Sequence, residues 1–483
     1  MKDRTAAYFL FSVTAVFVVF CFLFEYKDIR LFHQRIRFFS FHDGKEEVHG
    51  KDLLKEIRQD STKSDSVSVP GLSKLLYYPE EPDAALPAYL DSLKKQAYQE
   101  ISDSSIRESP FLLNIPVKGK YPLDAFFRSL DSLQAGKTGF RAGHYGDSQI
   151  EGDRITWTLR SFFQKRFGGI GNGFIPLDDV TEPQGYIRKS SGSWRRHTVA
   201  VNLIKNNTFG PGGSAFTYRN DSLAPVVKIS FQFPFQTLRL AYGYGKPGSR
   251  CQVYDGQSGK LIADTALSSA EDFQFVTISS RSLGSVKLRF LGPSPVIYGL
   301  WTDGNSGFQM DNYGLRGQSG DGLMRISSGR LQQMYRLLNM RLAILQFGGN
   351  VMPGIRNENI LSRYAGIYRD LYLHIFHALE KGSVLVIGVN DLSRSLNGTY
   401  KSFNYISEMR YLQRRYAVEN GMAFFDLYQF MGGKESISHW NKAGLASRDG
   451  HFSDKGRQIV STELFRALLY EYRAYQKRVN QKG

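Results

Sequence analysis

The sequence has only two cysteines among its 483 residues, Cys21 and Cys251. Two cysteines exclude a disulfide framework and a cysteine-rich metal site. The chain also lacks a glycine-rich phosphate loop, the spacing of a zinc site and a dinucleotide-binding fingerprint. We therefore expect neither a metal nor any other cofactor.

Long hydrophobic runs are scarce as well, and the chain has one. Residues 6–24 (AAYFLFSVTAVFVVFCFLF) carry no charged side chain. At about 1.5 Å per residue, a helix of this length spans roughly 28 Å, close to the thickness of a bilayer core. No small-residue cleavage site follows, which favours an uncleaved anchor over a signal peptide. The single run excludes a polytopic membrane protein and predicts one helix in contact with the lipid bilayer.

Acidic side chains are outnumbered by basic ones. The chain has 62 Lys and Arg and 45 Asp and Glu, which gives a net charge of +17. A basic surface attracts polyanions, including acidic glycans. Nothing beyond charge supports a nucleic-acid partner, and we expect none. Two basic residues precede the hydrophobic run and four follow it within residues 27–37. The positive-inside rule alone would therefore keep the remainder of the chain on the cytoplasmic side.

The remainder of the chain falls into segments of different pattern. Residues 41–110 are polar and mixed in charge, with one helical stretch near 83–102, and we interpret them as a stem or linker. Residues 111–185 begin an α/β domain. Residues 186–305 hold seven or eight short β-branched or aromatic runs, which is typical of a β-sandwich. Residues 306–483 alternate strands with helices, which predicts a parallel sheet covered on both faces.

The first strand–helix unit of the α/β domain contains a serine on a tight turn. A short apolar stretch from Phe140 runs into Gly-Asp-Ser at residues 146–148, and an amphipathic helix ending near Gly168 follows. A serine in such a turn can point its hydroxyl out of the sheet, and its backbone N–H can stabilise an oxyanion. The same residue type is also common as a plain helix cap.

Two later segments at strand or helix ends complete a possible catalytic set. Asn350 follows the apolar strand LAILQ and two glycines, so its amide can donate to a developing oxyanion, or the segment can be an ordinary turn. His451 lies shortly before the last predicted helix and is a candidate general base, with Asp449 placed to fix its tautomer. Alone, this histidine could equally be a surface residue.

Taken together, these segments resemble the SGNH (GDSL-type) hydrolase family. Its four blocks match Gly146–Ser148, Asn312–Gly317, Gly348–Asn350 and the pair Asp449 and His451. The resemblance implies a flavodoxin-like parallel sheet, which here would be interrupted by the β-sandwich. It also implies an acyl-serine mechanism without a cofactor.

The family resemblance assigns roles to individual residues. Ser148 would be the nucleophile, His451 the base and Asp449 the acid. The backbone N–H groups of Ser148 and Gly317, with the Asn350 side chain, would form the oxyanion hole.

One spacing departs from the family pattern. The family places its aspartate three residues before the histidine, whereas Asp449 is two before His451 and position 448 is Arg448. Asp449 could still reach the imidazole, or the histidine could work with a backbone carbonyl. Asp391, in GVND after another strand, is the reserve candidate for the acid, although a turn or cap role suits it better.

The insertion narrows the implied substrate. A sandwich between the first two blocks resembles the arrangement in bacterial polysaccharide and peptidoglycan O-acetyl esterases, where it serves as a carbohydrate-binding-like module. Sugar stacking would use exposed aromatics, although aromatics in short strands are more often core. The candidates are Trp194, Tyr218, Tyr242 and Tyr244.

The function implied is removal of O-acetyl or other short acyl groups from an O-acylated polysaccharide or peptidoglycan. Such an enzyme would be held in the bacterial inner membrane with its catalytic domain in the periplasm. Residues 1–40 would then comprise a cytoplasmic tip, the anchor and a juxtamembrane segment. The alternatives are an O-acetyltransferase on the same fold and a glycan-binding membrane protein whose catalytic block has decayed.

Overall fold

The computed structural model describes residues 29–31, 34–36, 86–97, 101, 106, 111–113, 121–136, 139–219, 224–269, 271–396 and 399–481. The chain divides into two units, residues 1–48 and 49–483. In the first, strands β1 (Ile29–Leu31) and β2 (Gln34–Ile36) pair antiparallel. The expected anchor at 6–24 lies outside the described residues. Among the helices described, none combines the length and apolarity needed to cross a membrane.

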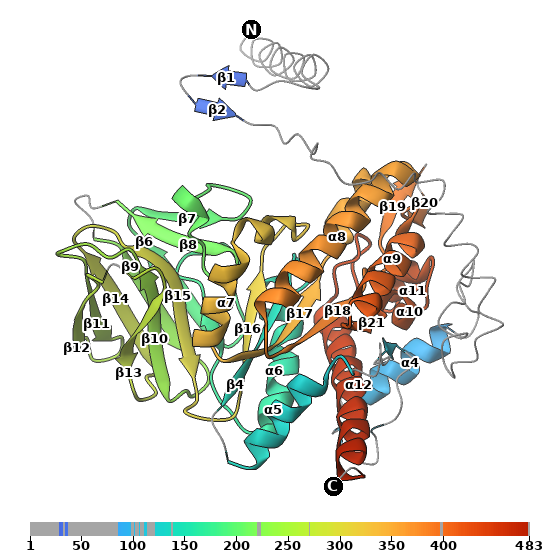
Figure 1. The fold of residues 1–483 in the computed structure, drawn as a ribbon, viewed down its shortest axis with the longest axis horizontal. Helices are drawn as coiled ribbons and strands as arrows, with labels where there is room; N and C mark the ends of the chain where they lie inside the picture. Colours follow the sequence, from blue (N-terminus) through green and yellow to red (C-terminus); the bar gives the residue numbers. More distant parts are fainter. Residues whose placement is uncertain are drawn as a thin grey trace. The chain divides into compact units, whose positions relative to one another are not determined.

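A six-stranded sheet in the order β16-β4-β17-β18-β21-β3 is the centre of the second unit (Figure 1). All neighbours are parallel except β21 and β3. Numbered along the chain from β4, the parallel strands have the flavodoxin-like order 2-1-3-4-5. This confirms the predicted parallel sheet. The strands are β3 (Leu112–Leu113), β4 (Phe140–Gly146), β16 (Phe308–Gly314), β17 (Met340–Gln346), β18 (Ser383–Ile387) and β21 (Ala423–Phe425).

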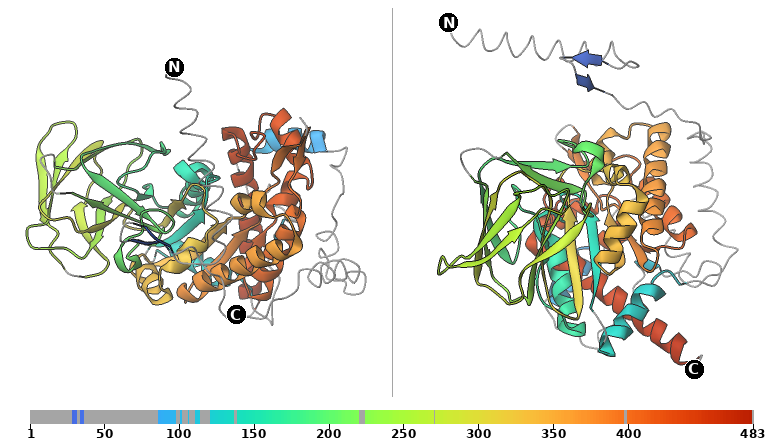
Figure 2. Two further views of the ribbon diagram at one scale, coloured as in Figure 1. Left: turned by 90° about the horizontal axis from the view of Figure 1, so that it is seen from above. Right: turned by 60° about the vertical axis from the view of Figure 1, so that its left-hand side comes forward.

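Helices cover both faces of this sheet, as the strand–helix alternation predicts (Figure 2). One face carries α7 (Ser328–Leu337), α8 (Glu358–Ala378) and α9 (Ile406–Glu419). The other carries α5 (Asp124–Gln134), α6 (Arg154–Phe167) and α12 (Asp454–Asn480), with the short α10 (Leu427–Met431) and α11 (Ser436–Lys442) in the same core. Strands β19 (Ser393–Leu396) and β20 (Thr399–Ser402) form a separate hairpin.

Helix α6 follows directly from its sequence pattern. Ile155, Leu159 and Phe163 are spaced to share one face, and all three are buried. The helix ends where Gly168 adopts a left-handed φ of 76°, a conformation that glycine takes without steric cost. Both the apolar face and the glycine stop were expected.

The helix expected within the stem is part of the globular core. It forms α4 (Leu86–Ala97), whose Leu86, Leu90 and Leu93 are buried. Its C-terminal carbonyls accept hydrogen bonds from α12, including one from Gln458 to Ala97. The interpretation of 41–110 as a stem is therefore wrong for this helix, because its apolar stripe is covered by α12 and α11.

A β-sandwich is inserted between α6 and β16, as predicted. One sheet has the order β13-β10-β15-β8-β7, and the other has the order β12-β11-β14-β9-β6. Strand β5 pairs with β15, so sandwich pairing starts before the expected boundary at residue 186. The strands are β5 (Gly173–Ile175), β6 (Tyr186–Ser191), β7 (Trp194–Thr198), β8 (Ser214–Tyr218), β9 (Val226–Phe231), β10 (Thr237–Gly243), β11 (Arg250–Asp255), β12 (Leu261–Ala266), β13 (Gln274–Ser279), β14 (Ser285–Leu291) and β15 (Val296–Asp303).

A buried ion-pair network joins the sandwich to the parallel sheet. Arg141 on β4 lies 2.7 Å from Asp303 on β15 and 2.5 Å from Asp311 on β16. Asp311 also accepts hydrogen bonds from the Trp301 indole and the Phe174 backbone N–H, both from sandwich strands. Because these charged groups are buried and paired, they fix how the sandwich sits against the sheet.

Candidate active site

The register of the parallel strands brings three of the expected segments to one edge of the sheet. Gly146 at the end of β4 is opposite Gly314 on β16 and Gln346 on β17. The segments that follow, containing Ser148, Gly317 and Asn350, therefore leave the sheet at the same level. Strands β4 and β17 flank the point where the strand order reverses, which is where open α/β sheets form binding sites.

Ser148 and His451 are in direct contact although 303 residues separate them. Ser148 Oγ lies 2.7 Å from His451 Nε2, the distance of a strong hydrogen bond. The turn that carries the serine is closed by hydrogen bonds from the Ile150 and Glu151 backbone N–H groups to the Asp147 carbonyl. Helix α6 begins only at Arg154, so the serine is in a turn before the helix and not in its first residues.

Asp449 reaches the same histidine in spite of its shortened spacing. Its Oδ2 lies 3.0 Å from His451 Nδ1. Gly450 makes this possible, because its φ of 94° turns the chain back at the residue between them, and a Cβ there would lie 2.1 Å from Leu392. Asp449, His451 and Ser148 thus form a continuous chain of contacts.

The charge state of Asp449 suits a partner of an imidazole N–H. Partial desolvation raises the pKa of its carboxyl, but hydrogen bonds from Ser447 and His451 outweigh that effect and leave the pKa below its ordinary value. The carboxylate is therefore ionised at neutral pH. Its side chain is 68% exposed, so solvent screens its charge.

Asp391, the reserve candidate for the acid, has a different set of partners. It accepts hydrogen bonds from the Ser402 hydroxyl at 2.7 Å and the Ile437 backbone N–H at 2.9 Å. Burial raises the pKa of Asp391 to about 7. Asp391 thus links β20 to the first turn of α11 by hydrogen bonds. This is the turn or cap role that the sequence favours for it.

Asn350 occupies a central place among the expected oxyanion donors. Its Nδ2 donates to Asp147 Oδ2 and to the Gln318 carbonyl, both at 3.0 Å. Asp147 precedes Ser148, and Gln318 follows Gly317, so one amide ties together the backbone around both other donors. Burial raises the pKa of Asp147 to about 6. Among the described residues, the backbone N–H groups of Ser148 and Gly317 have no partner.

Gln149 is a site residue that the sequence reasoning missed. It follows Ser148, is only 7% exposed, and donates from Nε2 to the Gly450 carbonyl at 2.7 Å. Its Oε1 accepts the Phe452 backbone N–H at 3.4 Å. Gln149 thus binds the backbone on both sides of His451. The only sequence signal is a polar side chain directly after the Gly-Asp-Ser turn.

The first residue of the second block has a supporting role. Asn312 Nδ2 donates to the Ile150 carbonyl at 2.8 Å and to Thr156 Oγ1 at 2.6 Å. Thr156 also contacts the buried His144, whose pKa is lowered to about 3 by burial. These neutral polar contacts hold the serine turn against β16 and α6.

The aromatic candidates for sugar stacking are mostly core. Tyr218 and Tyr242 are 6% and 5% exposed, so the expectation of exposed rings is wrong for both. Trp194 is half-buried against Tyr218 and Phe290, and Tyr244 is the one candidate classed as exposed, at 40%. Within the described ranges, we find no group of three or more His, Cys, Asp or Glu side chains arranged to hold a metal ion.

No family model matches the sequence. No curated protein matches it either. Among solved structures, a peptidoglycan O-acetylesterase is similar with a TM-score of 0.62 and 20% identity, over 75% of this chain and 99% of that chain. The chain has the fold of that esterase.

Shorter matches involve one part of the chain at a time. An acetylxylan esterase from Geobacillus stearothermophilus is 18% identical over 34% of this chain and 74% of its own, with a TM-score of 0.27. A family 32 carbohydrate-binding module from C. perfringens NanJ is 12% identical over 27% of this chain and 98% of its own, with a TM-score of 0.19.

Proposed function

We propose that the protein is an SGNH-type serine esterase that removes O-acetyl or other short acyl groups from a cell-wall or extracellular polysaccharide. The contact chain Ser148–His451–Asp449, with distances of 2.7 Å and 3.0 Å, is the observation that carries this proposal. Its position at the switch point of an α/β sheet adds support. The shared fold with a peptidoglycan O-acetylesterase makes a glycan ester the first substrate to test.

The reaction proceeds in two acyl transfers. His451 Nε2 takes the proton of Ser148 Oγ as this oxygen attacks the ester carbonyl carbon. The tetrahedral intermediate collapses when the bond to the sugar oxygen breaks, and His451 returns the proton to that oxygen. Water, deprotonated by the same histidine, then attacks the acyl-serine and releases acetate and the free Ser148. Asp449 keeps the imidazole in the tautomer with its proton on Nδ1.

A tetrahedral intermediate forms both when the serine is acylated and when water attacks the acyl-serine. In each, hydrogen-bond donors must stabilise the negative charge on the former carbonyl oxygen. The backbone N–H groups of Ser148 and Gly317 and the Asn350 amide are assigned this role. Loss of one such donor typically lowers turnover about 10²–10³-fold. Asp147 orients the Asn350 amide by accepting one of its two hydrogens, and the Gln318 carbonyl accepts the other. Donation to the oxyanion therefore requires the amide to exchange its hydrogen bond to Gln318 for one to the substrate.

We also propose that residues 6–24 anchor the chain in the bacterial inner membrane, with the catalytic domain in the periplasm. A polysaccharide ester outside the cytoplasm requires that placement. Protease treatment of spheroplasts tests it, because a periplasmic domain is degraded while the outer face alone is accessible. Full protection of the catalytic domain would overturn this placement.

The activity is tested with the full-length chain purified in mild detergent, beside Ser148→Ala and His451→Ala. Acetate release is measured from p-nitrophenyl acetate, O-acetylated peptidoglycan and O-acetylated xylan. We expect release by the unaltered chain, a loss of at least about 10³-fold in both variants, and an acetylated Ser148 peptide in mass spectrometry. Undiminished release by Ser148→Ala, or no release from any substrate by the folded chain, would contradict the proposal.

A further inference from the structure

The loop that carries the triad histidine is closed by pairing between its two ends. Ala446 and Phe452 form an antiparallel bridge. Inside this bridge, the Ser447 backbone N–H donates to the His451 carbonyl at 2.8 Å, and the Ser447 carbonyl accepts the Gly450 N–H at 3.1 Å. Both backbone groups of Ser447 therefore hold the loop closed, and its side chain lies among the residues that the loop presents.

The Ser447 side chain contacts the carboxylate of Asp449. Its hydroxyl donates to Asp449 Oδ1, and the same Oγ lies 3.1 Å from the His451 carbonyl oxygen. A hydroxyl has one proton to donate. The His451 carbonyl already accepts the Ser447 N–H, whereas the carboxylate is ionised at neutral pH. Because hydrogen bonds to a charged acceptor are the stronger ones, the proton goes to Asp449.

The two oxygens of the Asp449 carboxylate have different partners. Oδ2 lies 3.0 Å from His451 Nδ1. Oδ1 accepts the Ser447 hydroxyl and, at 3.4 Å, the His451 backbone N–H. The terminal torsion of an aspartate is broad when nothing restrains it. A hydrogen bond to Oδ1 restrains this torsion and so keeps Oδ2 directed at the imidazole.

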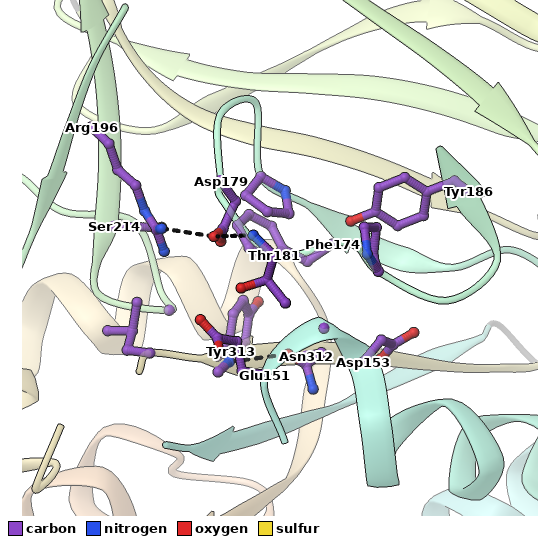
Figure 3. A pocket seen from close by; sticks show the side chains of 16 residues that line it. Glu151, Asp153, Phe174, Asp179, Thr181, Tyr186, Arg196, Ser214, Asn312 and Tyr313 are labelled. Atoms are coloured by element: carbon purple, nitrogen blue, oxygen red, sulfur yellow. Dashed lines mark hydrogen bonds and ion pairs between the residues drawn. The ribbon is translucent and has the colours of Figure 1, made fainter. Parts of the chain in front are cut away.

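Asp449 depends on such a contact because it lacks a cationic partner. Carboxylates also line a pocket between the sandwich and the serine turn (Figure 3). Each of those pairs with a guanidinium: Asp179 with Arg196 at 2.9 Å, Glu151 with Arg316 at 2.8 Å, and Asp153 with Arg160 at 2.6 Å. Within the described ranges, Asp449 is paired with no Lys or Arg. The adjacent Arg448 lies over the Tyr400 ring instead, 5.0 Å from its centroid.

We propose that Ser447 is a positioning residue that holds the Asp449 carboxylate toward His451. It thereby compensates for the contracted spacing, in which the acid is only two residues before the base. The inference rests on the proposed serine esterase function and deepens its mechanism. Ser447 contacts neither the nucleophile nor the ester, so it acts on the reaction through Asp449.

The first test compares Ser447→Ala with Ser447→Thr, which keeps the hydroxyl, in the full-length chain with p-nitrophenyl acetate. We expect kcat to fall about 5- to 10-fold in Ser447→Ala, the effect of one hydrogen bond, with KM unchanged. Ser447→Thr should restore most of the loss. Ser132→Ala on α5 is the control, since the Ser132 hydroxyl donates to the Arg128 carbonyl at 3.0 Å, and it should keep kcat. An unchanged kcat in Ser447→Ala, or equal falls in Ser447→Ala and Ser132→Ala, overturns the inference.

A double-mutant cycle tests whether Ser447 acts through Asp449. In an Asp449→Ala background the carboxylate is absent, so adding Ser447→Ala should lower kcat by less than about twofold. The same substitution in the unaltered chain should give the full 5- to 10-fold loss. Equal losses in the two backgrounds would show that Ser447 acts only by closing the loop, and would overturn the inference.

Labelling of Ser148 by a fluorophosphonate separates this inference from the proposed function. The reagent needs neither a glycan nor an ester: the serine oxygen forms a bond to phosphorus, fluoride leaves, and His451 takes the proton. We expect the labelling rate to fall about 5- to 10-fold in Ser447→Ala. Such a fall in a chain that releases no acetate from any substrate supports the positioning role and rejects the esterase. Equal labelling rates in a chain that does release acetate reject the positioning role alone. An unaltered chain that is not labelled also rejects it.

Discussion

Gln149 Nε2 donates a 2.7 Å hydrogen bond to the carbonyl of Gly450, which links the residue after the nucleophile to the residue before the histidine. The same side chain accepts the Phe452 backbone N–H. Ser148 and His451 come from opposite ends of the α/β domain, and no strand pairing joins their loops directly. Gln149 supplies that link and sets the distance between the serine and the imidazole.

Gln149→Met keeps the volume of the side chain and removes the hydrogen bonds to Gly450 and Phe452, together with a longer one of 3.5 Å to Asn390 Oδ1. We expect kcat for p-nitrophenyl acetate to fall about 10- to 100-fold with little change in KM, because a small displacement of a catalytic group lowers rate more than binding. Gln164→Met is the matched control, since Gln164 also donates to a backbone carbonyl, at Gly171, away from the site. An equal fall in kcat in both variants would show that Gln149 acts through general stability alone.

Asp449→Asn tests whether Asp449 acts as the acid of the catalytic triad although it is only two residues before His451. The asparagine can no longer hold the Nδ1 proton electrostatically, so we expect kcat to fall about 10- to 100-fold. This is less than the roughly 10⁴-fold known for buried triads, because Asp449 is exposed and screened. Asp391→Asn is the companion variant. It should leave kcat unchanged and lower the unfolding free energy by about 1–3 kcal/mol. A reversed pattern would make Asp391 the acid.

Much of the fold could be predicted because it is encoded locally. Strand–helix alternation predicts the parallel sheet, and the apolar face and glycine stop of α6 are visible in residues 155–168. The turn at 146–148, the segment at 348–350 and His451 follow strands or precede a helix, so their convergence follows from the topology alone.

The rest depends on contacts between distant segments. Gln149 and Gly450 are 301 residues apart, and the sequence around either residue carries no pattern that predicts their contact. Helix α4 has the same amphipathic pattern whether its apolar stripe packs on a neighbouring helix or lies in a linker. Only the tertiary structure decides that the stripe is buried against α12. Tyr242 has the same local pattern as an exposed strand aromatic and becomes core because the second sheet covers its face.

The raised pKa of Asp147 predicts that the stability of the protein depends on pH. Its pKa is about 6 in the folded chain and about 4 when unfolded. Between these values the folded state binds one more proton, so its contribution to stability is full below pH 4 and is lost as the pH rises through 6. The loss is about 3 kcal/mol by pH 7. Urea unfolding between pH 4 and pH 7 should show a steeper decline for the unaltered chain than for Asp147→Asn. Parallel curves would contradict this assignment.

The ion pairs that hold the sandwich against the sheet predict a large stability effect. Arg141→Met leaves Asp303 and Asp311 buried without their shared guanidinium, and removal of one member of a buried network typically costs about 3–5 kcal/mol. Arg336→Met is the control, because its pair with Glu380 is largely exposed and should contribute less than about 1 kcal/mol. Urea denaturation of the two variants measures the difference. Equal losses would mean that Arg141 does not set the stability of the junction between the sandwich and the parallel sheet.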